Sequence, residues 1–79
     1  MEIHYIISHL TSFYFVSKAE GDNNYIIRTR YTRKDVKECK EHMKETVRNS
    51  VKNLCTVRFT NSYTKHDYVY VVFKLYINN

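Results

Sequence analysis

One segment in the middle of the chain, residues 32–54, has the apolar spacing of a helix and stands between two stretches patterned like β-strands. Its apolar residues recur every three or four positions, so they share one face of that helix. They are Val36, Cys39, Met43, Val47, Val51 and Leu54. The helix is expected to begin at Thr32, whose hydroxyl can accept a hydrogen bond from the backbone N–H near Asp35. A helix with one apolar face must cover another layer, so the pattern predicts a two-layer fold.

Strand patterns precede this helix. Apolar residues at odd positions between 3 and 18 predict one long strand, bent or bulged near residues 8–12. They are Ile3, Tyr5, Ile7, Phe13 and Phe15. Residues 19–24 are the clearest turn signal and should join this strand to a second one, residues 25–31, as a β-hairpin. The two faces of the second strand are Tyr25, Ile27 and Tyr31 against Ile26, Arg28 and Arg30.

Two further strands are expected after the helix. Residues 55–60 alternate apolar and polar side chains, and residues 61–67 are predicted to be a polar connection. The last strand, residues 68–77, has an inward set and an outward set. The inward set is Val69, Val71, Phe73, Leu75 and Ile77, and the outward set is Tyr68, Tyr70, Val72, Lys74 and Tyr76.

The predicted fold is therefore α+β: a four-stranded, mainly antiparallel sheet with one helix packed on one face, in the order ββαββ. The chain has 79 residues, which suffice for one hydrophobic core and not for two. No repeat, low-complexity tract or linker divides it, so residues 1–79 are expected to form a single domain.

Two cysteines, Cys39 and Cys55, fall at predicted core positions on different elements. This placement is typical of buried, reduced thiols and predicts a cytoplasmic location, within the host cell if the protein is encoded by a phage or virus. Residues 1–10 include Glu2, His4 and His9, so they lack the basic start and unbroken apolar run of a signal peptide or membrane span. No membrane partner is expected.

Metal and cofactor sites are not predicted. The chain has one Gly and no Pro, so it cannot form a Gly-rich phosphate loop. Cys39 and His42 form a C-x-x-H pair. The spacing between this pair and the other residues that could bind a metal matches no zinc module. Those other residues are His4, His9, Cys55 and His66.

Catalytic residues are not predicted either, so the protein is expected not to be an enzyme. Metal-dependent hydrolysis needs converging carboxylates, whereas Asp22, Asp35 and Asp67 fall in a turn, a helix start and a connection. Cys55 and His66 could form a nucleophile and base only if the fold brought them together, and a buried cysteine is usually inert.

The net charge of +5, from 13 Lys and Arg against 8 Asp and Glu, favours a polyanion or an acidic protein surface as partner. The charge can equally serve only to keep a small protein in solution. The first candidate contact surface is the outward face of the sheet. Its predicted residues are Arg28, Arg30, Arg58, Tyr68, Tyr70, Lys74 and Tyr76. Arg with Tyr is typical of protein-interface hot spots and of surfaces that stack single-stranded bases, while aromatic pairs can also simply stabilise an exposed sheet.

The second candidate surface is a basic flank of the predicted helix, suited to phosphate groups. Its residues are Arg33, Lys37, Lys40, Lys44, Arg48 and Lys52. Glu38, Glu41 and Glu45 lie within three or four positions of several of these cations, so a salt-bridged, solvent-facing helix is the alternative interpretation.

The function predicted from these features is binding. Short length and abundant Lys, Asn, Ile, Tyr and Phe are typical of AT-rich phage or viral genomes, and the chain resembles in general character the small α+β proteins that phages direct against host defences. We therefore expect a small accessory protein that binds a host protein or nucleoprotein complex and inhibits it. The alternative is a basic module that binds single-stranded nucleic acid or a duplex backbone. A homodimer remains compatible with the sequence.

Overall fold

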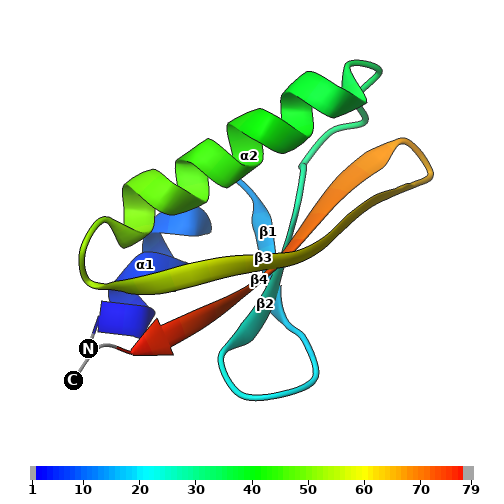
Figure 1. The fold of residues 1–79 in the computed structure, drawn as a ribbon. Coiled ribbons are helices and arrows are strands. Elements are labelled where there is room, and N and C mark those ends of the chain that lie inside the picture. The colour runs from blue at the N-terminus through cyan, green and yellow to red at the C-terminus, as the bar shows by residue number, and fades with distance from the viewer. Residues whose placement is uncertain (1, 78–79) are drawn as a thin grey trace.

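The computed structural model describes residues 2–77 as a four-stranded antiparallel sheet with a long helix across one face and a short helix beside it (Figure 1). The elements in chain order are α1 (Glu2–Leu10), β1 (Phe15–Lys18), β2 (Asn24–Arg28), α2 (Val36–Val51), β3 (Cys55–Lys65) and β4 (Tyr68–Ile77). The strands are ordered β1-β2-β4-β3, and every neighbouring pair is antiparallel. The predicted α+β class and four-stranded antiparallel sheet are confirmed, but the element order is αββαββ because of the additional helix.

Helix α1 replaces most of the long strand predicted for residues 3–18, and only Phe15–Lys18 is extended. Ile6 and Leu10 are fully buried one turn apart, and Tyr14 continues the same row. The odd-numbered aromatics that suggested a strand are instead exposed: Tyr5 by 60%, Phe13 by 50% and Phe15 by 55%. The sequence of this segment contains two apolar patterns, one alternating and one with helical spacing. The residues with helical spacing are the ones that pack into the core.

Helix α2 is shorter at both ends than predicted. It begins at Val36 with Asp35 at the N-cap, while Thr32 lies exposed in the preceding loop. It ends at Val51, and Lys52 follows with a positive φ of 50°. The predicted apolar face is confirmed at Cys39, Met43, Val47 and Val51, which are buried, and Val36 is partly buried. Leu54 was predicted to belong to this face but is 37% exposed, because the helix has already ended.

Strand β3 continues through the segment predicted to be a connection. A bulge between Phe59 and Asn61 shifts the register, and pairing with β4 then resumes as far as Lys65 opposite Tyr68. His66 and Asp67 both have positive φ, 53° and 65°, and form the two-residue hairpin turn. The polar composition of residues 61–65 led to the prediction of a connection. The segment is instead a strand whose residues are exposed or only partly buried on both faces.

The β1–β2 hairpin and β4 follow the sequence pattern more closely. Residues 19–23 form the turn as predicted, with Gly21 at a φ of 101° that a side chain would strain. Strand β2 ends at Arg28, so Tyr31 lies beyond it and is 79% exposed instead of sharing a face with Tyr25. Strand β4 has the predicted bounds, although Ile77 at its end is 46% exposed and does not join the core.

The core lies between the sheet and the two helices. The central strand β4 contributes alternate residues that are almost completely buried: Val69, Val71, Phe73 and Leu75. The helices are also joined by polar contacts, since His9 Nδ1 lies 2.7 Å from the Ser50 hydroxyl and the Tyr14 hydroxyl is 3.5 Å from that of Thr46. Both helices lie on the same face of the sheet, so within residues 2–77 the opposite face carries no helix (Figure 1).

The burial of α1 can be tested with a matched pair of leucine substitutions. Leu10→Ala should lower the free energy of unfolding by about 2–5 kcal/mol because it leaves a cavity under α1, whereas Leu54→Ala should cost less than about 1 kcal/mol. Urea unfolding followed by circular dichroism measures both. Equal effects of the two substitutions would contradict the placement of α1.

Candidate functional site

The sheet face opposite the helices, called here the outer face, is formed by every second residue of each strand. Its main residues are Phe15, Ser17, Ile26, Arg28, Arg58, Tyr63, Lys65, Tyr68, Tyr70, Val72, Lys74 and Tyr76. Six of the seven predicted contact residues lie there together: Arg28, Arg58, Tyr68, Tyr70, Lys74 and Tyr76. The prediction thus identified one continuous surface.

Arg30 is the exception. It lies beyond the end of β2, and its guanidinium donates a hydrogen bond to the carbonyl oxygen of Thr11 in the α1–β1 connection. Its side chain therefore ties two loops together and is not part of the outer face. Simple alternation assigned it to that face because β2 was predicted to end at Tyr31, three residues beyond its actual end at Arg28.

Aromatic and guanidinium groups on the outer face are held by one another. The Arg28 guanidinium carbon lies 4.6 Å from the ring centre of Phe15 and 4.2 Å from that of Tyr68, so it is stacked between two rings from different strands. Tyr63 and Tyr70, directly opposite each other, stack with centres 4.7 Å apart and planes 9° apart. These contacts order the side chains of the outer face in the free protein.

The charges on this face are all of one sign. Arg58 lies directly opposite Lys74 across the β3–β4 ladder, an arrangement that is destabilising for like charges. Throughout residues 2–77, the strands contain no Asp or Glu, and the ion pairs found in that range lie elsewhere. The outer face therefore presents cations without a counter-charge of its own.

Three aromatic or charged residues of the outer face were missed by sequence reasoning. Phe15 was predicted only as one of the odd-numbered apolar residues of a long first strand, and Tyr63 and Lys65 were placed in a connection. A signal for the last two was present, because they alternate with smaller polar residues up to the His–Asp pair that forms the turn.

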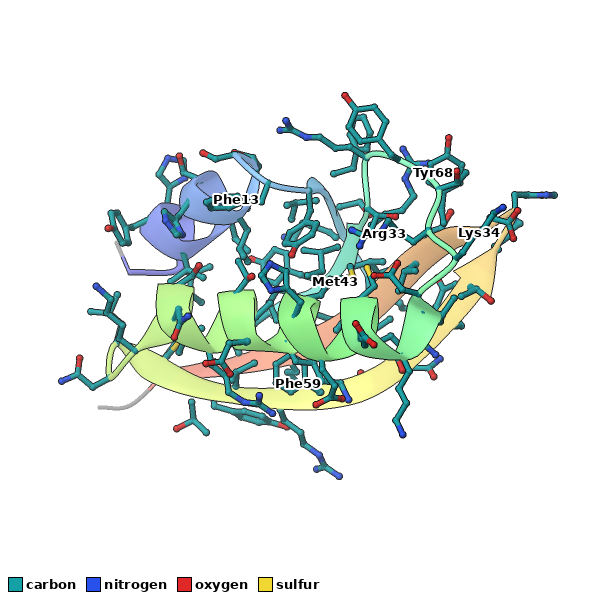
Figure 2. The ribbon with its side chains drawn as sticks, turned by 90° about the horizontal axis from the view of Figure 1, so that it is seen from above. Phe13, Arg33, Lys34, Met43, Phe59 and Tyr68 are labelled. Carbon is teal, nitrogen blue, oxygen red and sulfur yellow. The ribbon has the colours of Figure 1, made fainter. Side chains whose placement is uncertain are left out.

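The predicted basic flank of α2 lies on the side toward β3. The Lys44 Nζ atom and the Arg48 guanidinium carbon are 5.9 Å and 5.1 Å from the ring centre of Phe59. Figure 2 shows Phe59 on this side of α2 and Phe13 on the other side, near α1. Lys44 and Arg48 also contact Glu41 and Glu45 at 3.6 and 3.8 Å, as the salt-bridge alternative expects. The flank is thus partly paired within the helix.

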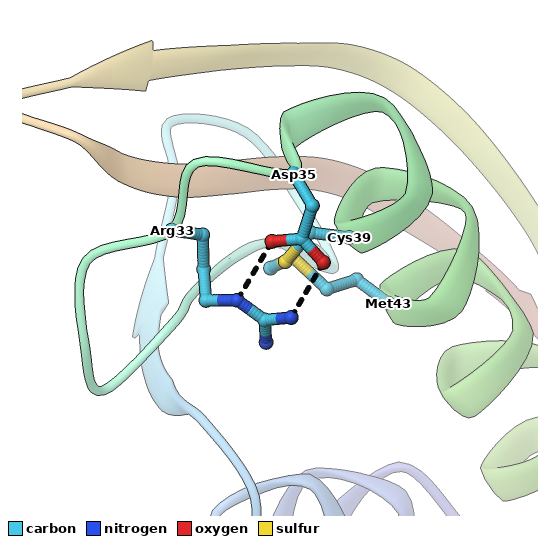
Figure 3. A network of polar contacts seen from close by, with 4 residues as sticks. All are labelled: Arg33, Asp35, Cys39 and Met43. Atoms are coloured by element: carbon cyan, nitrogen blue, oxygen red, sulfur yellow. Dashed lines mark hydrogen bonds and ion pairs between the residues drawn. The ribbon is translucent and has the colours of Figure 1, made fainter.

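The other members of the predicted flank are less uniform. Lys37 is exposed and Lys40 half-buried on α2, whereas Lys52 lies after the helix as its C-cap. Arg33 precedes the helix and makes two hydrogen bonds to the Asp35 carboxylate, at 3.0 and 2.7 Å (Figure 3). This contact lowers the pKa of the Asp35 carboxyl and occupies Arg33, so Arg33 does not act with the lysines.

The thiol of Cys39 lies behind this ion pair and contacts the Met43 sulfur at 3.8 Å (Figure 3). Burial raises the pKa of the Cys39 thiol, and the positive charge of Arg33 opposes that rise. Arg33, Asp35 and Cys39 line a shallow hollow together with Glu38 and His42. Within residues 2–77, however, no group of three or more His, Cys, Asp or Glu side chains could hold a metal ion. Cys55 is buried as predicted.

The remaining candidate pair, Cys55 and His66, is separated by the whole length of β3. At about 3.3 Å per residue, the two residues stand roughly 35 Å apart. They cannot act on one substrate atom.

Comparison of the chain with family models, curated proteins and solved structures found no match. None of the helices within residues 2–77 is both long and apolar enough to cross a membrane.

The environment of Cys39 predicts low thiol reactivity. In a Cys55→Ser variant, the native protein should react with iodoacetamide at mildly alkaline pH at least about tenfold more slowly than free cysteine, since burial keeps the thiol protonated and covered. Mass spectrometry follows the alkylation, and the same variant in guanidinium chloride is the control. Alkylation at the rate of free cysteine would show that this thiol is accessible.

Proposed function

We propose that this protein is a non-enzymatic binding protein that docks on a host protein or nucleoprotein complex and inhibits it by occupying a contact surface. The outer face of the sheet makes that contact. The observation that carries the proposal is the uncompensated charge of this face, above all Arg58 opposite Lys74 with no acidic residue on any strand. An acidic partner surface supplies the missing counter-charge.

The aromatic groups suit a protein partner because they are already ordered. Stacking of Arg28 between two rings, and of Tyr63 on Tyr70, limits the side-chain entropy that is lost on binding. Rigid Tyr and Arg side chains are the residues that most often dominate binding energy in protein interfaces.

The same stacking makes the face less suited to nucleobases. One side of each of these four rings is already covered by a neighbouring side chain, so a base can stack only on the remaining side. The hydroxyl groups and ring edges remain available for contacts with a protein surface.

Alanine substitutions on the outer face test this proposal. Arg58→Ala, Tyr70→Ala and Tyr76→Ala should each weaken the complex with the host protein by about 1–4 kcal/mol, because each removes an outer-face side chain of a type that dominates binding energy in interfaces. The partner is first isolated from host lysate, and its affinity for each variant is then measured by titration calorimetry.

The matched control is Tyr31→Ala, which removes a tyrosine that is even more exposed, in a loop outside the outer face. It should change affinity by less than about 0.5 kcal/mol. Circular dichroism confirms that each variant is folded. If the outer-face variants bind like the unsubstituted protein, the outer face is not the contact.

The second candidate function is nucleic-acid binding through the basic flank of α2. The observation that favours it is the row of cations along the side of this helix that faces β3. Changing Lys40, Lys44, Arg48 and Lys52 together to Gln should then abolish retention on heparin and flatten the salt dependence of oligonucleotide binding. Each lost phosphate contact removes about one released counterion. Lys18→Gln, on the strand farthest from this flank, is the single-charge control. Unchanged retention of the fourfold variant would exclude this function.

A further inference from the structure

Strand β3 is a long edge of the sheet. It pairs with β4 on one side, and no other strand in residues 2–77 pairs with residues 57–65 on the other side. An edge of this length offers a row of backbone N–H and C=O groups to another extended chain. The strand at the opposite edge, β1, has four residues and offers far fewer of these backbone groups.

Cations border the β3 edge on the helix side. Lys44 and Arg48 reach over Phe59, whose side chain points from β3 toward α2. Lys40 and Lys37 precede Lys44 on the same flank of the helix, about one and two turns earlier respectively. A chain lying along β3 would therefore have positive charge on its α2 side.

Cations also border this edge on the other side of the sheet. Arg58 and Lys65 are exposed on the outer face of β3 itself. In a strand added beside β3, successive side chains would point alternately toward α2 and toward the outer face. Both sets would meet positive charge.

A hollow between α2 and the middle of β3 can receive such a side chain. It has a volume of about 300 Å³ and is bordered by Lys44, Phe59, Thr60, Asn61 and Ser62. The bulge at residues 59–61 opens this part of the strand, because Thr60 has no partner position in β4.

We propose that residues 57–65 of β3 bind an extended acidic segment of a partner protein, which adds to the sheet as a fifth strand. Backbone hydrogen bonds hold the segment, and its carboxylates contact Lys44 and Arg48 on one side and Arg58 and Lys65 on the other. The inference goes beyond the proposed function because it concerns the strand edge, and it can hold even if the rest of the outer face contacts nothing.

A second copy of this chain is disfavoured at the same edge. Antiparallel pairing of β3 with itself would bring Lys44 and Arg48 of each copy near those of the other along a shared seam, with no carboxylate on either strand. Charged edges of this kind prevent self-pairing in many sheet proteins. The β3 edge therefore disfavours pairing with a second copy of the chain and favours pairing with an acidic strand.

The test uses a short fluorescein-labelled peptide of repeated Glu-Glu-Val triplets, which carries carboxylates on both faces when extended. Binding is measured by fluorescence anisotropy with the full chain. The control peptide has the same sequence but carries N-methyl groups on the backbone amides of consecutive residues, so both of its edges are blocked; it keeps the charge and cannot form a ladder. N-methylation should weaken binding at least about tenfold, and the unmodified peptide should slow hydrogen exchange at backbone amides of residues 57–65.

Protein variants locate the contact. Lys44→Glu should weaken peptide binding about tenfold, whereas Lys18→Glu, the same charge reversal on β1, should change it less than about twofold. Tyr76→Ala separates the two proposals, since Tyr76 lies on the outer face of β4 opposite Thr56, outside residues 57–65. It should weaken the host complex and leave peptide affinity within about twofold.

Three results would overturn the inference. One is equal binding of the two peptides, which would mean charge attraction without strand addition. Another is the absence of peptide binding or of added protection in β3. The third is tighter binding of an oligothymidylate of matched length without protection of β3 amides, which would assign the basic edge to nucleic acid.

Discussion

Packing of α2 on the inner side of β4 is the interaction on which the rest of the structure depends. Val47 and Met43 on the helix, and Val71 and Phe73 on the strand, are fully buried in the same core between the helices and the sheet. Because β4 lies between β2 and β3, this contact also holds the two flanking strands in place. Helix α1 completes the layer beside α2 (Figure 1). The chain has no third helix in residues 2–77 to cover the other face, so the outer face must be ordered by its own side chains. The stacked Tyr63–Tyr70 pair and the Arg28 contacts provide that order.

The elements that contact this central packing are those that the sequence predicts well. Strand β4 alternates cleanly and α2 has a single apolar face because each has one side buried and one side exposed. Prediction fails where that contrast is absent. In α1, exposed aromatic residues lie between the buried ones, so a strand pattern and a helix pattern overlap. In the second half of β3, both faces are largely polar, and backbone pairing with β4 rather than burial keeps the segment extended.

Much of the candidate site could be predicted for the same reason. Tyr68, Tyr70, Tyr76 and Lys74 belong to β4, where the faces are unambiguous, and Arg28 and Arg58 lie in correctly predicted parts of their strands. Phe15, Tyr63 and Lys65 could not be assigned because they lie in the segments whose conformation was misjudged. The stacking of Arg28 between Phe15 and Tyr68 depends on the strand order, since it joins β1, β2 and β4. No local pattern carries that information.

Segregation of charge connects the fold with the proposed binding. Every acidic residue of the chain lies outside the strands, while the sheet carries Arg28, Arg58, Lys65 and Lys74 on one face. Placing Arg58 opposite Lys74 costs roughly 0.2–1 kcal/mol relative to a neutral pair, and a single acidic residue at either position would remove that cost. In the free protein, solvent screening keeps the repulsion tolerable because Arg58 is exposed. When an acidic partner excludes water from this surface, the same cations gain a counter-charge in a less polar environment. The arrangement is thus slightly unfavourable in the isolated protein and would be favourable in the proposed complex with an acidic surface.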